Sequence, residues 1–153
     1  RMDEYIAVLR ALWTDGRCDF RGATITIADG YMYPKPTKGR CIPILVGGES
    51  EAAIQRAARL ADGWNAINLP AAEARQRVSR LKDLTRRNGR DPEKLRIIAT
   101  IFPTTTLDDL HRYREAGVTE FNLMTGDVPV EEGGLQEQMR DFQARFVDLV
   151  SGW

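Results

Sequence analysis

Residues 44–65 read ILVGGESEAAIQRAARLADGWN, and this stretch decides the fold. It opens with an apolar run typical of a strand that is buried on both faces. Two glycines follow, and then a helix for which Ser50 is the expected N-cap. A second strand begins at Gly63. The residues between the two strands suffice for the helix and for nothing else. The stretch therefore predicts a β-α-β unit with parallel strands. The expected buried face of the helix carries Ile54, Ala57, Ala58 and Ala61.

The pattern continues to the end of the chain, so residues 43–153 predict four β-α units. The expected strands are IPILV, GWNAINL, LRIIATIF and TEFNLM, starting at residues 42, 63, 95 and 119. Helix boundaries are marked by Pro70, by Asn88-Gly89 and by the capping pair Thr106 and Asp109. Short loops between such units require a parallel sheet. A complete (β/α)8 barrel takes about 250 residues, so the sequence predicts an α/β fold that is half of a TIM barrel. The last helix is expected to carry an apolar stripe: Leu135, Met139, Phe142, Phe146 and Leu149.

We treat residues 1–153 as a single domain. Its first 42 residues do not show the β-α pattern. Residues 1–16 predict a leading helix, with apolar residues at helical spacing from Met2 to Trp13. No strand precedes that helix, as if an earlier unit were missing. Residues 17–42 predict an irregular insertion with one short strand around Ile25 and Ile27, and its prolines exclude regular structure near residue 34. An insertion of this length either covers a site or packs as a surface flap.

Composition excludes several classes of partner. Lys plus Arg and Asp plus Glu both number 22, so the net charge is zero, and neither nucleic acid nor an anionic membrane surface is expected to bind. No apolar run approaches the roughly 20 residues of a membrane-spanning helix, and the N-terminus does not resemble a signal peptide. Cys18 and Cys41 lack metal-ligand spacing, so we expect no metal site and reduced thiols in a cytoplasmic protein.

Gly47 and Gly48 lie where the first of these parallel strands ends, which is where ligands bind in such folds. Glycine reaches positive φ and lets the backbone approach a ligand closely. The helix that follows presents unpaired N–H groups and the positive end of its dipole, which favours an anion such as phosphate. A tight turn with no ligand is the alternative that this short motif leaves open.

Three segments resemble the bacterial-luciferase-like monooxygenase family, and most closely its branch of oxidoreductases that depend on the deazaflavin coenzyme F420. They are RMDEYIAVLRALWTD (1–15), YPKP (33–36) and IPILVGGESEAAIQRAARLADGWN (42–65). The most specific feature is VGG followed by ADGW at this separation. The resemblance extends over essentially the whole chain. It implies a TIM barrel of which this sequence is the carboxyl-terminal portion.

The resemblance also implies site residues. The family holds the phosphate of F420 or FMN on the Gly-Gly amides, which are Gly47 and Gly48 here, and Glu49 and Ser50 share the turn. The Ser50 hydroxyl is able to donate a further hydrogen bond to phosphate, whereas the negative Glu49 side chain is expected to point elsewhere. Nearby, the Asp62 carboxylate is expected to tie down the corner between the helix and the next strand. Asn65 and Asn68 flank the end of that strand and are placed to face a ring or a phosphate.

The resemblance leaves the catalytic residues unknown, since those of the family lie mostly in the amino-terminal half of the barrel. The one histidine, His111, falls on a charged outer helix. Two readings therefore stay open. The chain is part of a flavin- or deazaflavin-dependent oxidoreductase or monooxygenase with a small-molecule substrate, or it is a non-catalytic half-barrel that serves binding or assembly. Another phosphate-binding barrel is a third.

A half-barrel would leave the inner face of its sheet open to water. We expect that face to be apolar, with Ile44, Val46, Ile98 and Phe102 among its residues. Burial of such a face favours association. The sequence therefore predicts a homo-oligomer or pairing with a partner half-barrel.

Overall fold

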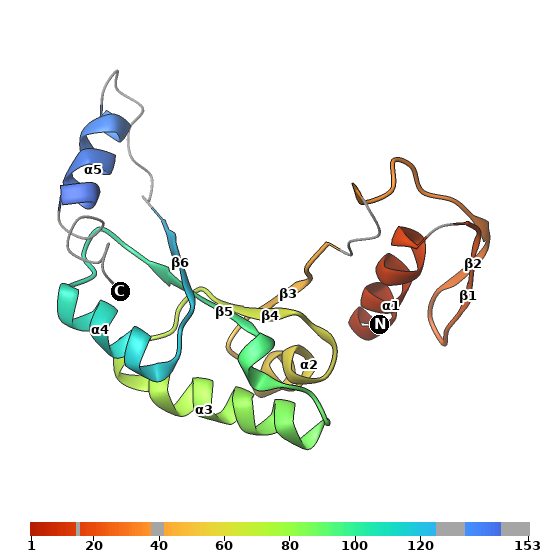
Figure 1. Cartoon of the computed structure of the whole chain (residues 1–153), viewed down its shortest axis with the longest axis horizontal. Helices are drawn as coiled ribbons and strands as arrows, with labels where there is room; N and C mark the ends of the chain where they lie inside the picture. The colour runs from red at the N-terminus through yellow and green to blue at the C-terminus, as the bar shows by residue number, and fades with distance from the viewer. Residues whose placement is uncertain (15, 38–41, 125–133, 145–153) are drawn as a thin grey trace.

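The computed structural model describes residues 1–14, 16–37, 42–124 and 134–144 (Figure 1). The amino-terminal part contains helix α1 and two strands. The rest alternates strands and helices in the predicted order. The bounds are α1 Met2–Trp13, β1 Cys18–Arg21, β2 Thr26–Gly30, β3 Leu45–Gly47, α2 Glu51–Leu60, β4 Gly63–Ala66, α3 Ala71–Arg87, η2 Pro92–Lys94, β5 Arg96–Ile101, α4 Leu107–Ala116, β6 Glu120–Leu123 and α5 Gly134–Phe142.

The main sheet has four parallel strands in the order β3-β4-β5-β6, as predicted. Helices α2, α3 and α4 lie together on one side of it (Figure 1). Val46 pairs with Trp64, and Trp64 pairs with Ile97, so these three side chains share one face. All three belong to the core between sheet and helices. The β-α units are therefore wound as in part of a (β/α) barrel, with the helices outside.

Small residues on α2 bring that helix close to the sheet. On the predicted face, Ile54, Ala57 and Ala58 of α2 and Ala61 just after it are completely buried. Val78 and Leu81 in the middle of α3 and the Trp64 ring are also completely buried. Gly63 allows a further close approach, because a Cβ there would lie 2.3 Å from the carbonyl oxygen of Arg96. The predicted capping is present as well: the Thr106 and Asp109 side chains cap α4 reciprocally, and Gly117 ends it at φ 96°.

The other face of the sheet, which would line the barrel interior, is less apolar than predicted. Val46 belongs to the core on the helix side and Ile44 packs against it, so the prediction that these two face inward is wrong. Alternation instead places Arg96, Ile98 and Thr100 of β5 on the inner face. The error arose because β3 is only three residues long, and an apolar run carries no period that assigns its faces.

Residues 17–42 contain more order than predicted. β1 and β2 form an antiparallel hairpin with an irregular register between Cys18 and Phe20. The Glu4 carboxylate of α1 anchors it, accepting hydrogen bonds at 2.9–3.0 Å from the backbone amides of Ala23, Thr24 and Ile25. The predicted short strand near Ile25 and Ile27 corresponds to β2, whereas β1 was missed because the alternation of Cys18 and Phe20 with charged residues covers only four positions.

Helix α5 agrees only in part with its predicted apolar stripe. Phe142 packs against the core, but Met139 is 58% exposed. Phe146 and Leu149 lie outside the described residues, as does Cys41, while Cys18 is a buried free thiol. Among the helices in the described ranges, none has the length and apolar character needed to cross a membrane.

Candidate functional site

The turn between β3 and α2 is built around Gly48. Gly48 has φ 101°, a left-handed conformation that favours glycine. A Cβ there would already touch the Cβ of Ala53 at 3.6 Å. Gly47 is the last residue of β3 and is exposed. The sequence places the two glycines at the carboxyl end of a strand, and the structure agrees.

Two hydrogen bonds fix this turn to β4. The Gly48 amide donates to the carbonyl oxygen of Asn65 at 3.3 Å. The Nε1–H of Trp64 donates to the Gly48 carbonyl at 2.7 Å, and Trp64 is completely buried. The Gly48 amide is thus part of the framework, and the free donors for a ligand lie one step further along the chain.

Those donors are at the start of α2. Ser50 is the N-cap, and its Oγ accepts from the Ala53 amide at 3.2 Å. The first amides of a helix have no partner within it, and within the described part of the chain no other group takes those of Glu51 and Ala52. The Ser50 hydroxyl keeps its own proton to donate. With the helix dipole, these groups form a surface that suits an anion.

The acidic side chains of the turn are held by other groups. Glu49 Oε1 accepts from the backbone amides of Ile67 (2.6 Å) and Asn68 (3.0 Å), so its carboxylate is held by the loop after β4 and not by the start of α2, as expected. Glu51 binds the Arg80 guanidinium at 2.6 Å. This hydrogen bond holds the pKa of Glu51 below its usual range.

Arg77 is a site residue that the sequence did not reveal. Its Nη1 donates to the Glu49 carbonyl at 3.4 Å, which places a cation from α3 beside the turn. A hollow of about 370 Å3 lies there, lined by Glu51, Gln76, Arg77 and Arg80. The residue spacing along α3 showed a charged face, but it did not show that α2 packs beside that face.

The remaining predicted residues divide into two roles. Asp62 Oδ2 accepts from the Ile44 amide at 2.8 Å and from Arg10 at 2.9 Å, which confirms that it ties the corner between α2 and β4. Asn65 lies next to Gly47 in the sheet, and its Oδ1 is buried without a hydrogen-bond partner in the described structure. Asn68 is exposed.

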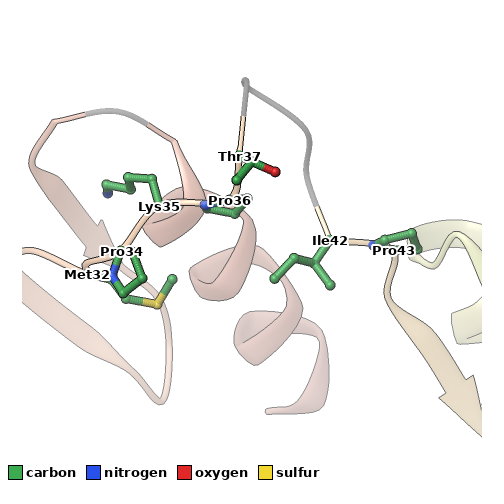
Figure 2. A pocket seen from close by; sticks show the side chains of 7 residues that line it. All are labelled: Met32, Pro34, Lys35, Pro36, Thr37, Ile42 and Pro43. Carbon is green, nitrogen blue, oxygen red and sulfur yellow. The ribbon is translucent and has the colours of Figure 1, made fainter.

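A second hollow, of about 680 Å3, lies elsewhere. It lies on the amino-terminal side of β3 and is lined by Met32, Pro34, Lys35, Pro36, Thr37, Ile42 and Pro43 (Figure 2). Among the described residues that line it, Lys35 is charged, and its Nζ is held by the Leu12 carbonyl at 2.8 Å. Nζ also lies 5.1 Å from the ring centroid of Tyr33. This mostly apolar hollow lies at the amino end of β3. The amides at the start of α2, which suit an anion, follow the carboxyl end of β3.

Other reactive side chains lie away from the turn. His111 is on α4 and exposed, as predicted. Within residues 1–14, 16–37, 42–124 and 134–144, no three His, Cys, Asp or Glu side chains are grouped as metal ligands would be.

Curated proteins with similar sequences are longer than this chain. An uncharacterised protein of Mycobacterium tuberculosis (strain ATCC 25618 / H37Rv) is 36% identical over 121 residues, which are 78% of this chain and 40% of that protein. Pyrimidine monooxygenase RutA of Enterobacter sp. (strain 638) is 34% identical over 94 residues, 59% of this chain and 25% of that protein. The chain thus spans well under half the length of these relatives.

Solved structures share the fold at low sequence identity. Long-chain alkane monooxygenase LadA superposes with a TM-score of 0.75 at 14% identity, covering 97% of this chain and 55% of that one. The coenzyme F420-dependent tetrahydromethanopterin reductase of Methanopyrus kandleri gives 0.72 at 10%, covering 97% and 61%. A riboflavin lyase solved with modified FMN gives 0.53 at 15%, covering 75% and 30%.

The four parallel β-α units therefore form part of a larger barrel in the structural relatives. The family model described as luciferase-like monooxygenase matches residues 1–145. With its fold, its Gly-Gly turn and a match over nearly its full length, the chain belongs to the luciferase-like monooxygenase family.

Proposed function

We propose that this chain supplies the phosphate-binding turn of a flavin- or deazaflavin-dependent oxidoreductase that acts on a small-molecule substrate. The observation that carries the proposal is the start of α2. There, the amides of Glu51 and Ala52 are free of partners within the described structure, next to Gly48 in the left-handed conformation. Such an arrangement favours an anion.

The residues around these amides suit a phosphate. The Ser50 hydroxyl is able to donate while its oxygen caps α2. Arg77, which also pairs with Glu73 at 3.5 Å, places its guanidinium beside the Glu49 carbonyl. The nearest carboxylates do not compete, because Glu49 is held by the loop after β4 and Glu51 by Arg80. These contacts support the binding of a ligand phosphate at the start of α2.

F420 and FMN both carry a phosphate, and family relatives named above include proteins that depend on F420 or were solved with modified FMN. When bound, such a cofactor supplies the redox chemistry. The part of this chain would be to bind and orient it: the α2 amides and Ser50 hold the phosphate, and Arg77 neutralises part of its charge. The rest of the barrel would complete the site.

The substitution Gly48→Val tests this proposal. A β-branched residue resists positive φ, and its methyl groups would fill the space beside Ala53. We expect at least tenfold weaker binding of FMN and of F420, measured by isothermal titration calorimetry. Gly89→Val is the matched control, since Gly89 also has positive φ (70°) but lies at the far end of α3.

The control separates backbone strain from loss of the site. If both variants weaken binding equally, strain alone accounts for the loss. If Gly48→Val binds both cofactors as tightly as the parent, the turn is not a phosphate site. Ser50→Ala, expected to weaken binding about threefold to tenfold through one lost hydrogen bond, provides an independent readout.

A further inference from the structure

The side chain of Glu49 connects two loops at the carboxyl end of the sheet. Glu49 belongs to the turn between β3 and α2. One of its carboxylate oxygens, Oε1, accepts from the backbone amide of Ile67 at 2.6 Å and from that of Asn68 at 3.0 Å. Both amides lie in the loop that follows β4. Because hydrogen bonds to an ionised acceptor are stronger than those between neutral groups, the carboxylate holds this loop against the turn.

The backbone of Glu49 is restrained on both sides. It follows Gly48, whose amide and carbonyl both bond to β4. It precedes Ser50, the N-cap of α2, and its own carbonyl accepts from Nη1 of Arg77 at 3.4 Å. A group that restrains the start of α2 therefore also restrains the point from which the carboxylate reaches the loop.

The rear of the loop after β4 is anchored by a different residue. The hydroxyl of Tyr113 on α4 donates to the carbonyl oxygen of Leu69, and both residues are buried. Ile67 and Asn68, between this anchor and β4, are exposed. Within the described part of the chain, the side chain that bonds to them is that of Glu49. Loss of the carboxylate should thus release the front of the loop and leave its rear in place.

We infer that Glu49 is a positioning residue that couples the loop after β4 to a phosphate at the start of α2. The inference rests on the proposed function. The held carboxylate restrains the turn before a ligand arrives, which lowers the entropic cost of ordering it. By linkage, a phosphate on the turn favours the state in which the loop is held, by the same factor as the held loop raises phosphate affinity. Glu49 acts through the loop and the turn, not by contact with the ligand.

Two substitutions separate this coupling from simple repulsion between charges. Glu49→Gln keeps an oxygen that accepts from the loop but removes the charge, whereas Glu49→Ala removes both. Because like charges repel, charge alone predicts that both variants bind a phosphate ligand equally well and more tightly than the parent. The inference predicts that Glu49→Ala binds FMN about fivefold more weakly than Glu49→Gln does, measured on the full chain by isothermal titration calorimetry. Glu93→Ala, which removes an exposed carboxylate paired with Lys82, is the matched control and should bind as the parent does.

Amide hydrogen exchange, followed by NMR, gives a measurement that a merely structural role would not change. In the parent and in Glu49→Gln, saturating FMN should slow exchange of the Ile67 and Asn68 amides. The slowing should be about fivefold, matching the factor between the affinities of the two variants, because the coupling is reciprocal. In Glu49→Ala, FMN should leave the exchange rates of both amides unchanged.

The remaining outcomes contradict the inference. Equal affinity of Glu49→Gln and Glu49→Ala for FMN would overturn it, and so would FMN-dependent protection that persists in Glu49→Ala. If FMN leaves the exchange of both amides unchanged in the parent, while Gly48→Val still loses FMN, the coupling is overturned and the proposed function stays intact. A parent chain that binds no FMN at millimolar concentration would overturn both.

Discussion

At the scale of single residues, the indole of Trp64 connects the two most specific motifs of the sequence. Its Nε1–H donates to the Gly48 carbonyl at 2.7 Å from a completely buried ring. The bond supplies the Gly48 carbonyl with a donor that water would otherwise have to provide. The conformation of Gly48 therefore depends on a side chain from the next strand.

Trp64→Phe should loosen this turn, because it removes the donor and keeps most of the ring. An unpaired buried carbonyl costs about 1–3 kcal/mol, and we expect a loss of unfolding free energy of that size in urea, followed by far-UV circular dichroism. Trp13→Phe at the end of α1 is the control for ring size, since Trp13 is only partly buried. Equal destabilisation of the two variants would contradict a structural role for the indole N–H.

The sequence predicts the role of a residue where that role depends on short-range patterns. Ser50 as N-cap and Asp62 at the corner follow from short-range patterns, and the structure confirms both. Arg77 and the partnerless oxygen of Asn65 depend on which elements pack together, and single-residue chemistry contains no such information.

At the scale of elements, the hairpin β1–β2 is held to α1 by one carboxylate. Hydrogen bonds to Glu4, first of all from the Thr24 amide, lower the pKa of Glu4. The folded protein thus favours the charged form. The contribution of Glu4 to stability is present above the ordinary glutamate pKa and is lost as the pH falls through the lowered value.

We expect the amide proton of Thr24 to report this titration. Followed by NMR from pH 7 to pH 2, its chemical shift should stay constant through the ordinary glutamate range and change only at lower pH. In Glu4→Gln the step should be absent, because no proton is taken up there. A step at the ordinary glutamate pKa in the parent would show that the amides do not bind the carboxylate in solution.

This hairpin also shows where prediction of elements from sequence reaches its limit. The β-α units after residue 43 have strong local signals, including buried apolar runs and helix caps, and the structure contains each of them. β1 has neither signal. The turn that joins it to β2 is held by Glu4, some twenty residues away in sequence, and a contact of that range has no local pattern.

At the scale of the whole molecule, the two faces of the sheet differ, since helices pack on one, whereas on the other Ile98 is 3% exposed and the Arg96 side chain 44%. The helices cover the side of Trp64 and Ile97 (Figure 1). The inner face carries polar groups as well as Ile98, and the Arg96 and Glu120 side chains bind each other across it at 2.6 Å while 44% and 39% exposed. Association through this face would therefore be partly polar, and not apolar as the sequence predicted.

We still propose that the chain associates, with a second copy or with the remainder of a barrel, because the inner face and both edges of the sheet invite pairing. Light scattering after size exclusion at low micromolar concentration should give a mass above 17.3 kDa. Asn122→Arg adds charge to the inner face of β6 and should favour the monomer. Ser79→Arg, on the exposed side of α3, should not. A parent that elutes as a stable monomer would refute the proposal.

The bond between Trp64 and Gly48 also bears on how the sequence is free to evolve. A chain that replaces the tryptophan loses the donor on which the glycine turn depends, and a chain that replaces the glycine strains the left-handed turn that holds the carbonyl in front of the indole N–H. Neither change is neutral by itself, so the two positions should vary together among descendants of one ancestor. The two positions are sixteen residues apart, and this coupling gives a physical reason to expect that relatives keep the separation of VGG and ADGW.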